Sequence, residues 1–438
     1  MLRFMWRSPT CYDISSALMC RLTQHRLFLV AGFVILLLNP ANSQAPSEMR
    51  TWTNTEGRTI QARLLRREDA NLVFQLANGQ QATVPMASLS DVDQHFIRTK
   101  FPLAAAMTWP DVVEVSTKAI EVKAVEEDAA QRSFVYQSEF FQFTAQDKLA
   151  VSVMKEIART FESTHALVSA LPWSVHPAPP EDFGYYQAKF YLNRRNYILD
   201  GGPENSGGVY FTGDRIFRIP FDSLGLEMRG KTWFKNESYR NDTLVHEITH
   251  QMMHDVLPFL PVWIIEGSAE YTEMLPYNAG KFLASSHQRG IREYLRSAFE
   301  NRGIAFTDAS NFAEHMNVTH EQWAQRSMSS GGQSRLYHTS TVLVYYFCHL
   351  EGDGKGTRFI NYMRQVGKAR DAWKEFFKNP QVKRNPDGSY SYPTTLPLPE
   401  QERDEKYGLQ LQSMLLDGRT PLQLEEDIRN AYKKIGIR

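Results

Sequence analysis

The feature that most constrains this chain is the segment 242–254, in which two histidines stand four residues apart. Apolar residues recur through the segment at helical spacing, so we expect it to form one helix. On a helix, His246 and His250 leave the same side, and Glu247 follows the first of them directly. Two neutral imidazoles at this spacing are half of a zinc site, with a glutamate placed to work on a metal-bound water.

A third ligand is expected from the next helical segment, 261–271. The prolines Pro258 and Pro261 end the first helix and let the chain turn back. Glu266 then supplies a carboxylate, and a catalytic zinc takes three protein ligands with an open fourth position. Glu270 lies four residues later on the same helical face, where it can accept the free ring N–H of a ligating histidine. These residues predict a zinc site built from two successive helices.

The pattern H-E-x-x-H followed by W-x-x-E-G-x-A-E-Y resembles the gluzincin metallopeptidases, a group of the peptidase MA-like superfamily that contains the aminopeptidase-N-like and thermolysin-like enzymes. The resemblance implies zinc on His246, His250 and Glu266, with a supporting carboxylate at Glu270. It also implies that Glu247 is the general base in the hydrolysis of peptide bonds. The spacing of the third ligand varies across the group, so it does not select a branch.

An oxyanion donor is expected at the start of a strongly apolar helix that opens near Ser334. Tyr337 matches, by order and context, the tyrosine that precedes a helix in aminopeptidase-N-like enzymes and donates to the oxyanion. The family's glycine three positions later is replaced by Ser340, so a packing role for Tyr337 stays open. His338 is the alternative donor.

His254 extends the series of histidines at four-residue intervals. On a continuous helix it would lie about 12 Å along the axis from His246, which is too far to share one ion. Zincins that use a third histidine break the helix with a glycine first, and no glycine lies between His250 and His254. We therefore expect His254 to pack in the core or to support the ligands.

The strand just before the zinc helix has a special role in gluzincins, because it is an exposed edge that pairs with an extended peptide substrate. By position, that strand would fall within 208–219, where the residues predict a hairpin. An ordinary sheet strand is the equal alternative. The sequence shows no family motif for gripping a substrate amino terminus, which favours endopeptidase over exopeptidase action.

Residues 49–99 are predicted to form a separate small barrel. Apolar residues alternate at 58–64 and 72–76, and Asn78 with Gly79 supplies a tight hairpin turn. The motifs Arg-Thr-Trp-Thr-Asn-Thr-Glu-Gly-Arg and Val-Pro-Met-Ala-Ser-Leu-Ser-Asp-Val-Asp resemble the SLA-homology domain, an SH3-like domain of endocytic adaptors. The resemblance implies an SH3-like fold and a protein partner for this region.

The remaining residues, 110–438, are predicted to form a zincin-like catalytic domain, which makes the whole chain α+β. Alternating segments before residue 220 indicate a mixed sheet, interrupted by a long amphipathic helix near 149–171. The part from about 281 to 438 is predicted to be mostly helical, beginning with one helix over 281–301.

Residues 1–43 are predicted to be a signal peptide, with Met19 as an alternative start. The twelve-residue apolar run 27–38 follows basic residues and precedes a small-x-small cleavage site, Ala41-Asn-Ser43. A membrane span needs about 20 apolar residues, so an uncleaved anchor is the less favoured alternative. After cleavage Cys348 is the only cysteine, which excludes an internal disulfide. We expect a secreted, periplasmic or cell-envelope protein without a membrane span.

The composition sets the remaining limits on function. The 49 basic and 49 acidic residues balance, so the totals give no reason to expect nucleic acid as a partner. The predicted activity is that of a zinc metallopeptidase acting on peptide or protein substrates. Two alternatives stay open: a catalytically silent scaffold on a peptidase fold, and a zinc hydrolase of cell-wall peptide or of a non-peptide bond.

Overall fold

The computed structural model describes residues 49–68, 71–100, 108–116, 118–236, 238–302, 311–329, 331–385 and 389–437. The predicted signal peptide lies outside these residues. The described chain is α+β and divides between Thr108 and Trp109 into two compact units. Within the same residues, no helix combines the length and the apolar character needed to cross a bilayer.

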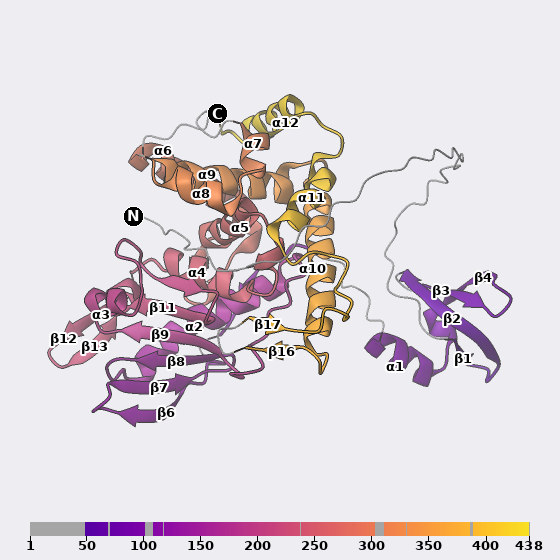
Figure 1. Ribbon diagram of the computed structural model, residues 1–438, viewed down its shortest axis with the longest axis horizontal. Helices are drawn as coiled ribbons and strands as arrows, with labels where there is room; N and C mark the ends of the chain where they lie inside the picture. The colour runs from indigo at the N-terminus through magenta and orange to yellow at the C-terminus, as the bar shows by residue number, and fades with distance from the viewer. Residues whose placement is uncertain are drawn as a thin grey trace, which may run out of the picture. The chain divides into compact units, whose positions relative to one another are not determined.

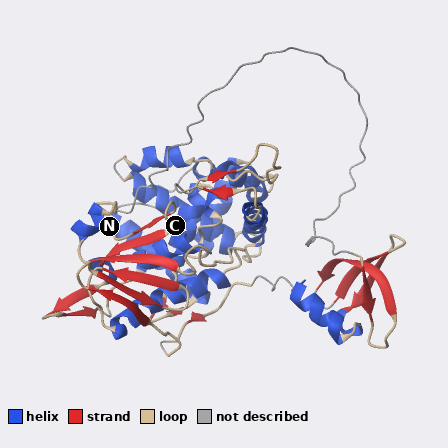
Figure 2. Cartoon of the chain, turned by 60° about the horizontal axis from the view of Figure 1, so that its bottom comes forward, coloured by secondary structure: helices blue, strands red, loops and turns tan. Residues whose placement is uncertain are grey.

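The N-terminal unit is a four-stranded antiparallel sheet followed by one helix (Figure 2). Its elements are β1 (Arg50–Thr53), β2 (Thr59–Glu68), β3 (Asn71–Leu76), β4 (Gln81–Pro85) and α1 (Asp91–Lys100). Trp52 is fully buried, and its indole N–H donates to the carbonyl of Ala62 at 2.9 Å. Arg50 pairs with Asp93 at 2.6 Å, which ties α1 to β1. The described pairings leave β1 and β4 as the two edges of the sheet, so they do not close a barrel.

The larger unit contains a six-stranded mixed sheet with the order β10-β11-β9-β8-β7-β6 (Figure 1). Its strands are β6 (Lys123–Asp128), β7 (Ser133–Gln137), β8 (Phe141–Ala145), β9 (Tyr186–Tyr191), β10 (Val209–Phe211) and β11 (Ile216–Pro220). The strands β8, β9 and β11 are parallel, whereas the other pairs are antiparallel. The hairpin expected within 208–219 is therefore confirmed as β10–β11, and β10 is an edge strand.

The long amphipathic helix is confirmed as α2 (Val151–Ala170), which packs on the sheet through aromatic residues. The ring of Phe161 meets those of Phe141 and Phe143 edge-on, with centroids 5.1 and 5.0 Å apart. All three side chains are fully buried. Edge-to-face pairs of this kind add specificity to the burial of apolar area, and they hold the sheet and the helices in one core.

The chain is mostly helical after the sheet, and short strand pairs interrupt it. The helices are α3 (Arg194–Leu199), α4 (Asp242–Met252), α5 (Val262–Met274), α6 (His287–Arg302), α7 (Phe312–Met316), α8 (His320–Ser327), α9 (Gly332–Tyr345), α10 (Thr357–Phe377), α11 (Glu405–Leu416) and α12 (Pro421–Lys434). The short strands are β5 (Val113–Glu114), β12 (Leu226–Arg229), β13 (Thr232–Lys235), β14 (Tyr277–Asn278), β15 (Lys281–Phe282), β16 (Lys383–Arg384) and β17 (Tyr390–Ser391).

The prediction of one helix over 281–301 is wrong at its start. Residues 281 and 282 form β15, which pairs with β14 on one side and with β5 on the other. The helix α6 begins only at His287, after a 3-10 turn over Ala284–Ser286. Pairing with β5, a strand from a distant part of the sequence, therefore overrides the local helical pattern.

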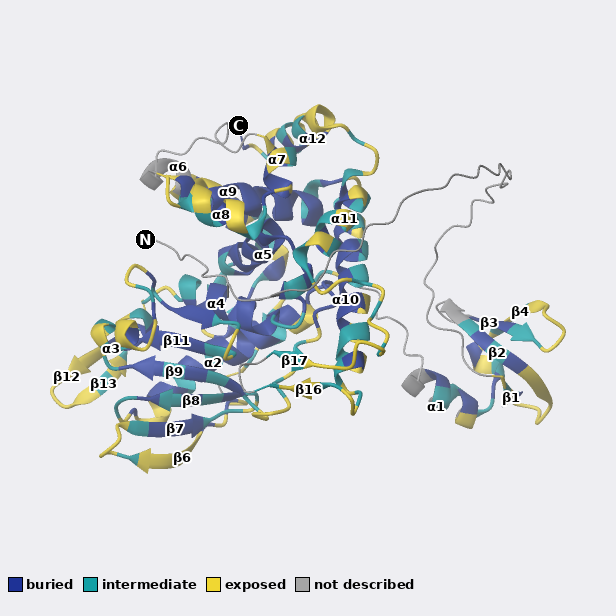
Figure 3. Ribbon diagram, in the orientation of Figure 1, coloured by how far each residue is buried: buried dark blue, intermediate teal, exposed yellow. Residues whose placement is uncertain are grey.

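The helix α5 lies at the centre of the helical part, packed against α4 on one side and α9 on another (Figures 1 and 3). Gly267 allows α9 to approach α5 closely. A Cβ atom there would lie 2.6 Å from the carbonyl oxygen of Ser340 and 2.6 Å from a methyl group of Val344. Only glycine fits that approach, so the residue next to Glu266 sets how near α9 comes to α5.

Candidate metal centre

The helix α4 carries its two histidines into the interior. Every residue from 244 to 252 is buried. The expectation of one helix through His254 is wrong, because α4 ends at Met252. There the N–H of Met253 bonds the carbonyl of Thr249, and the N–H of His254 bonds that of Gln251 in a tightened last turn. The chain then turns back and enters α5 after Pro261.

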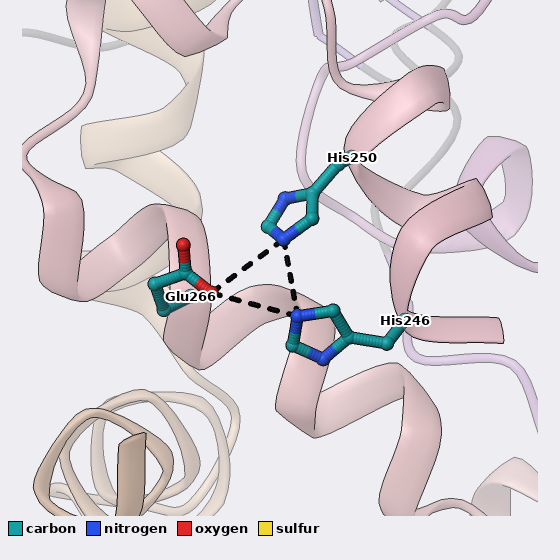
Figure 4. Close-up of side chains that lie close together, drawn as sticks. All are labelled: His246, His250 and Glu266. Carbon is teal, nitrogen blue, oxygen red and sulfur yellow. Dashed lines mark hydrogen bonds and ion pairs between the residues drawn. The ribbon is translucent and has the colours of Figure 1, made fainter. Parts of the chain in front are cut away.

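His246, His250 and Glu266 converge from α4 and α5 on one point (Figure 4). The Nε2 atoms of the two histidines are 3.1 Å apart, and Oε2 of Glu266 lies 3.5 Å from each of them. A point equidistant from these three atoms is about 2 Å from each, the length of a zinc–nitrogen or zinc–oxygen bond. All three side chains are almost fully buried.

The electrostatics of the three groups are strongly coupled. Burial alone would raise the pKa of Glu266, but the charge of His250 and contacts with both histidines hold that pKa well below its usual range. Burial would lower the pKa of His250, yet the charge of Glu266 raises it. The carboxylate is therefore ionised beside two ring nitrogens, and such a carboxylate attracts a cation into the space between them.

A carboxylate that the sequence analysis did not single out holds the far side of His246. Oε2 of Glu273 lies 3.1 Å from Nδ1 of His246, whereas Oε1 of the predicted Glu270 lies 3.6 Å away. The nearer acceptor of the ring N–H is thus Glu273. Glu266, Glu270 and Glu273 follow the i, i+4, i+7 spacing of one helical face, so this periodicity would have identified the residue. An Nδ1–H bond to a carboxylate leaves the Nε2 lone pair facing the other ligands.

Glu247 is held beside the centre by the edge strand of the sheet. The backbone N–H of Tyr210 on β10 donates to its Oε2 at 3.0 Å. Burial raises the pKa of Glu247, and the charges of His246 and His250 oppose that rise. The carboxylate is thus adjacent to the candidate ligands and oriented by one backbone donor.

The structure brings Tyr337 next to the centre. Its ring lies 6.1 Å from that of His246, centroid to centroid, and meets Trp323 edge-on at 5.6 Å. Ser340, which stands in place of the family's glycine, pairs through its hydroxyl with Nε2 of His315 at 2.8 Å. Tyr337 therefore packs on Trp323 close to the candidate centre, and its role as an oxyanion donor stays a prediction.

The two other histidines of the prediction lie elsewhere. The ring of His338 stacks on Tyr294 of α6, with centroids 6.4 Å apart. His254 lies 2.9 Å from the hydroxyl of Tyr210 through its Nδ1 atom. Within the described residues, neither histidine belongs to a group of side chains that could share a metal ion.

The residues present fit a metal ion. Oε2 of Glu266 and Nδ1 of His250 are buried and make no hydrogen bond within the described part of the chain. An ionised buried oxygen without a donor is costly, and a cation in the centre would satisfy it. The chain matches no protein-family model, and no similar curated protein or solved structure was found. The functional argument therefore depends on this geometry.

Proposed function

We propose that this protein is a zinc-dependent metallopeptidase of the gluzincin type. The observation that carries the proposal is the buried triangle of His246, His250 and Glu266, whose ligand atoms are 3.1 to 3.5 Å apart, with Glu247 at its side. Two imidazoles and one carboxylate are a ligand set of catalytic zinc, and they leave a fourth position for water or substrate.

When bound in this triangle, zinc would polarise a substrate carbonyl and make a water molecule acidic near neutral pH. Glu247 accepts the proton of the attacking water and delivers it to the leaving nitrogen. The Tyr210 N–H donates to Oε2 of Glu247 and so orients the carboxylate. Glu273 holds the Nδ1 proton of His246 and so keeps that ring oriented. Tyr337 is the proposed donor to the oxyanion that develops on the substrate carbonyl.

The edge strand β10 supports a peptide as the substrate. Tyr210 turns its N–H away from β11 and toward Glu247, so the side of β10 that is not paired with β11 faces the centre. An extended peptide that added to this edge would run past the general base. This arrangement suits an extended peptide substrate, and we propose endopeptidase action because the sequence shows no family motif for gripping a substrate amino terminus.

The proposal also covers the N-terminal unit and the predicted signal peptide. A four-stranded sheet with a helix tied to β1 through Asp93 is compatible with an SLA-homology, SH3-like domain that binds a protein partner. The apolar run and cleavage site of residues 1–43 support secretion or export to the periplasm or cell envelope.

Metal analysis of the full-length protein beside two variants tests the function. We expect bound zinc in the wild type and in Glu247→Gln, and its loss in His246→Ala. Glu247→Gln should hydrolyse an unfolded protein about 10²- to 10⁴-fold more slowly than the wild type, the usual contribution of a general base. A wild type that lacks zinc would contradict the proposal. Zinc without any hydrolysis would favour a silent scaffold, and hydrolysis confined to cell-wall peptide would favour that other class.

A further inference from the structure

A cavity of about 550 Å³ opens at the C-terminal end of α4. Gln251, which directly follows His250, and His254, one helical turn beyond it, form part of its wall. Tyr210 connects the two places, because its backbone N–H holds Glu247 while its hydroxyl meets His254 at 2.9 Å. The cavity therefore lies along the path that a peptide on β10 would follow.

Basic side chains outnumber acidic ones around this cavity. The basic lining residues are Arg215, Arg370, Lys374, Lys378, Arg384 and Arg403, against the acidic Glu181, Asp182 and Asp255. Two of the acids are already paired with lining bases: Asp255 meets Lys374 at 2.6 Å, and Asp182 meets Arg384. Arg370 and Lys378 also pair, with Asp371 at 2.8 Å and Glu375 at 3.5 Å outside the lining. The positive charge that favours an anionic group is therefore that of the remaining lining bases, although the charge totals of the whole chain balance.

Arg215 is the lining base that directly follows β10 in the chain. It lies in the tight turn between β10 and β11 with a φ of 60°, a region that favours glycine. It is half-buried, and with the described residues it makes no ion pair and no side-chain hydrogen bond. Burial and the charge of Arg215 together lower the pKa of His254 to about 3. An arginine in a strained turn with no partner in the described chain is available to a ligand.

We propose that this cavity is a subsite for acidic side chains of the peptide substrate, with Arg215 as the residue that selects them. The proposal rests on the peptidase function and names its substrate class. Glu247 and His254 are seven residues apart along α4 and its last turn, or about 10 Å at the rise of a helix. Three extended residues cover about that distance. The acidic side chain is thus expected about three residues from the scissile bond.

Binding to the Glu247→Gln protein tests this without turnover. The probes are a short fluorescent peptide with two glutamates and the same peptide with glutamines. We expect the acidic peptide to bind about tenfold more tightly, the effect of one hydrogen-bonded charge. Adding Arg215→Gln should reduce the preference to about twofold, and raising the ionic strength should weaken it.

Arg132 provides the matched control. It also lies in a turn at positive φ, 51°, but between β6 and β7 at the opposite edge of the sheet, and it is exposed. Arg132→Gln removes the same charge and should leave the preference unchanged. Equal binding of the two peptides, or equal effects of the two substitutions, would overturn the proposal.

Two further binding measurements identify which anionic group the cavity binds. If amidation of the peptide's carboxyl terminus abolishes the preference, the cavity binds a terminal carboxylate and the side-chain proposal is wrong. Tighter binding of an oligothymidylate than of the acidic peptide would also overturn it. Because binding is measured without hydrolysis, a wild type that cleaves nothing but keeps the preference contradicts only the catalytic proposal.

Discussion

The helix α5 lies against two histidine pairs, one buried and one half-buried, and their neighbours differ in kind. The first is the metal-site pair, His246 and His250, which meets carboxylates. The second is the stacked pair, His287 and His349, whose rings lie nearly parallel with centroids 3.7 Å apart. The metal-site pair is buried and the stacked pair half-buried, and the groups that surround the two pairs differ in charge.

The stacked pair is surrounded by hydroxyl groups and aromatic rings. Nε2 of His349 lies 2.8 Å from the hydroxyl of Tyr271, and Nδ1 of His287 lies 3.0 Å from that of Tyr345. The ring of Trp109 covers His349, with centroids 4.4 Å apart. Burial holds the pKa of His349 well below its usual range, and the charge of His287 lowers it further. Burial therefore favours the neutral form of both rings.

The difference shows how one residue type serves two purposes in one core. Ionised Glu266 raises the pKa of His250 against burial, so the metal-site pair favours a positive charge between its rings. Hydroxyl groups satisfy the stacked pair without adding charge, so a cation there would remain uncompensated. The comparison predicts that only one of the two pairs binds zinc.

Substituting one histidine in each pair should produce the largest difference in zinc affinity. His250→Ala removes one of the three protein ligands. We expect zinc affinity to fall by more than about 100-fold, because only two protein ligands remain. His349→Gln keeps a hydrogen-bond partner for Tyr271 and should leave the zinc dissociation constant within about twofold, since it touches no ligand. Competition titration with a zinc chelator measures both constants. A comparable loss in His349→Gln would end the distinction between the pairs.

Glu273→Gln should have the next largest effect, because it weakens the acceptor that orients His246. We expect zinc affinity to fall about 10- to 100-fold, as for other carboxylates that hold a ligating histidine. Glu270→Gln should have a smaller effect, since Glu270 lies 3.6 Å from the ring nitrogen and Glu273 3.1 Å. The same chelator titration compares the two variants. A larger loss of zinc affinity in Glu270→Gln than in Glu273→Gln would mean that Glu270, the residue predicted from the sequence, orients His246.

The smallest expected effect is on the pH dependence of stability. Because the pKa values of His287 and His349 are lowered in the folded protein, the unfolded chain binds more protons below about pH 6.5. The free energy of unfolding should therefore decrease as the pH falls from there. His349→Gln should make that decrease shallower by about 1 kcal/mol per pH unit between pH 6 and 5.

Urea unfolding of the apoprotein at several pH values measures this difference. Other buried histidines, such as His165 with its pKa lowered by burial to about 4, contribute equally to the wild type and to the variant. The difference between the two proteins isolates the stacked pair. Identical slopes would mean that His349 keeps an ordinary pKa in the folded protein.

Most of the candidate centre was predictable because it depends on helical periodicity. The four-residue spacing of His246 and His250 places both rings on one face, and the spacing of Glu266 and Glu270 does the same on the next helix. The predictions that failed depended on distant partners or on how a helix ends. Pairing of β15 with β5 delays the start of α6, and a tightened last turn ends α4 before His254.

By itself, the sequence determined which side chains share a helical face, because that relation is set within a few residues. Only the tertiary structure decided that the two faces meet, since this depends on the turn between α4 and α5 and on the close approach of α9 at Gly267. It also decided that Glu273 lies nearer His246 than Glu270 does, and that Arg215 faces a basic cavity. Differences of a fraction of an ångström between neighbouring acids follow from how helices pack, and residue spacing does not contain them.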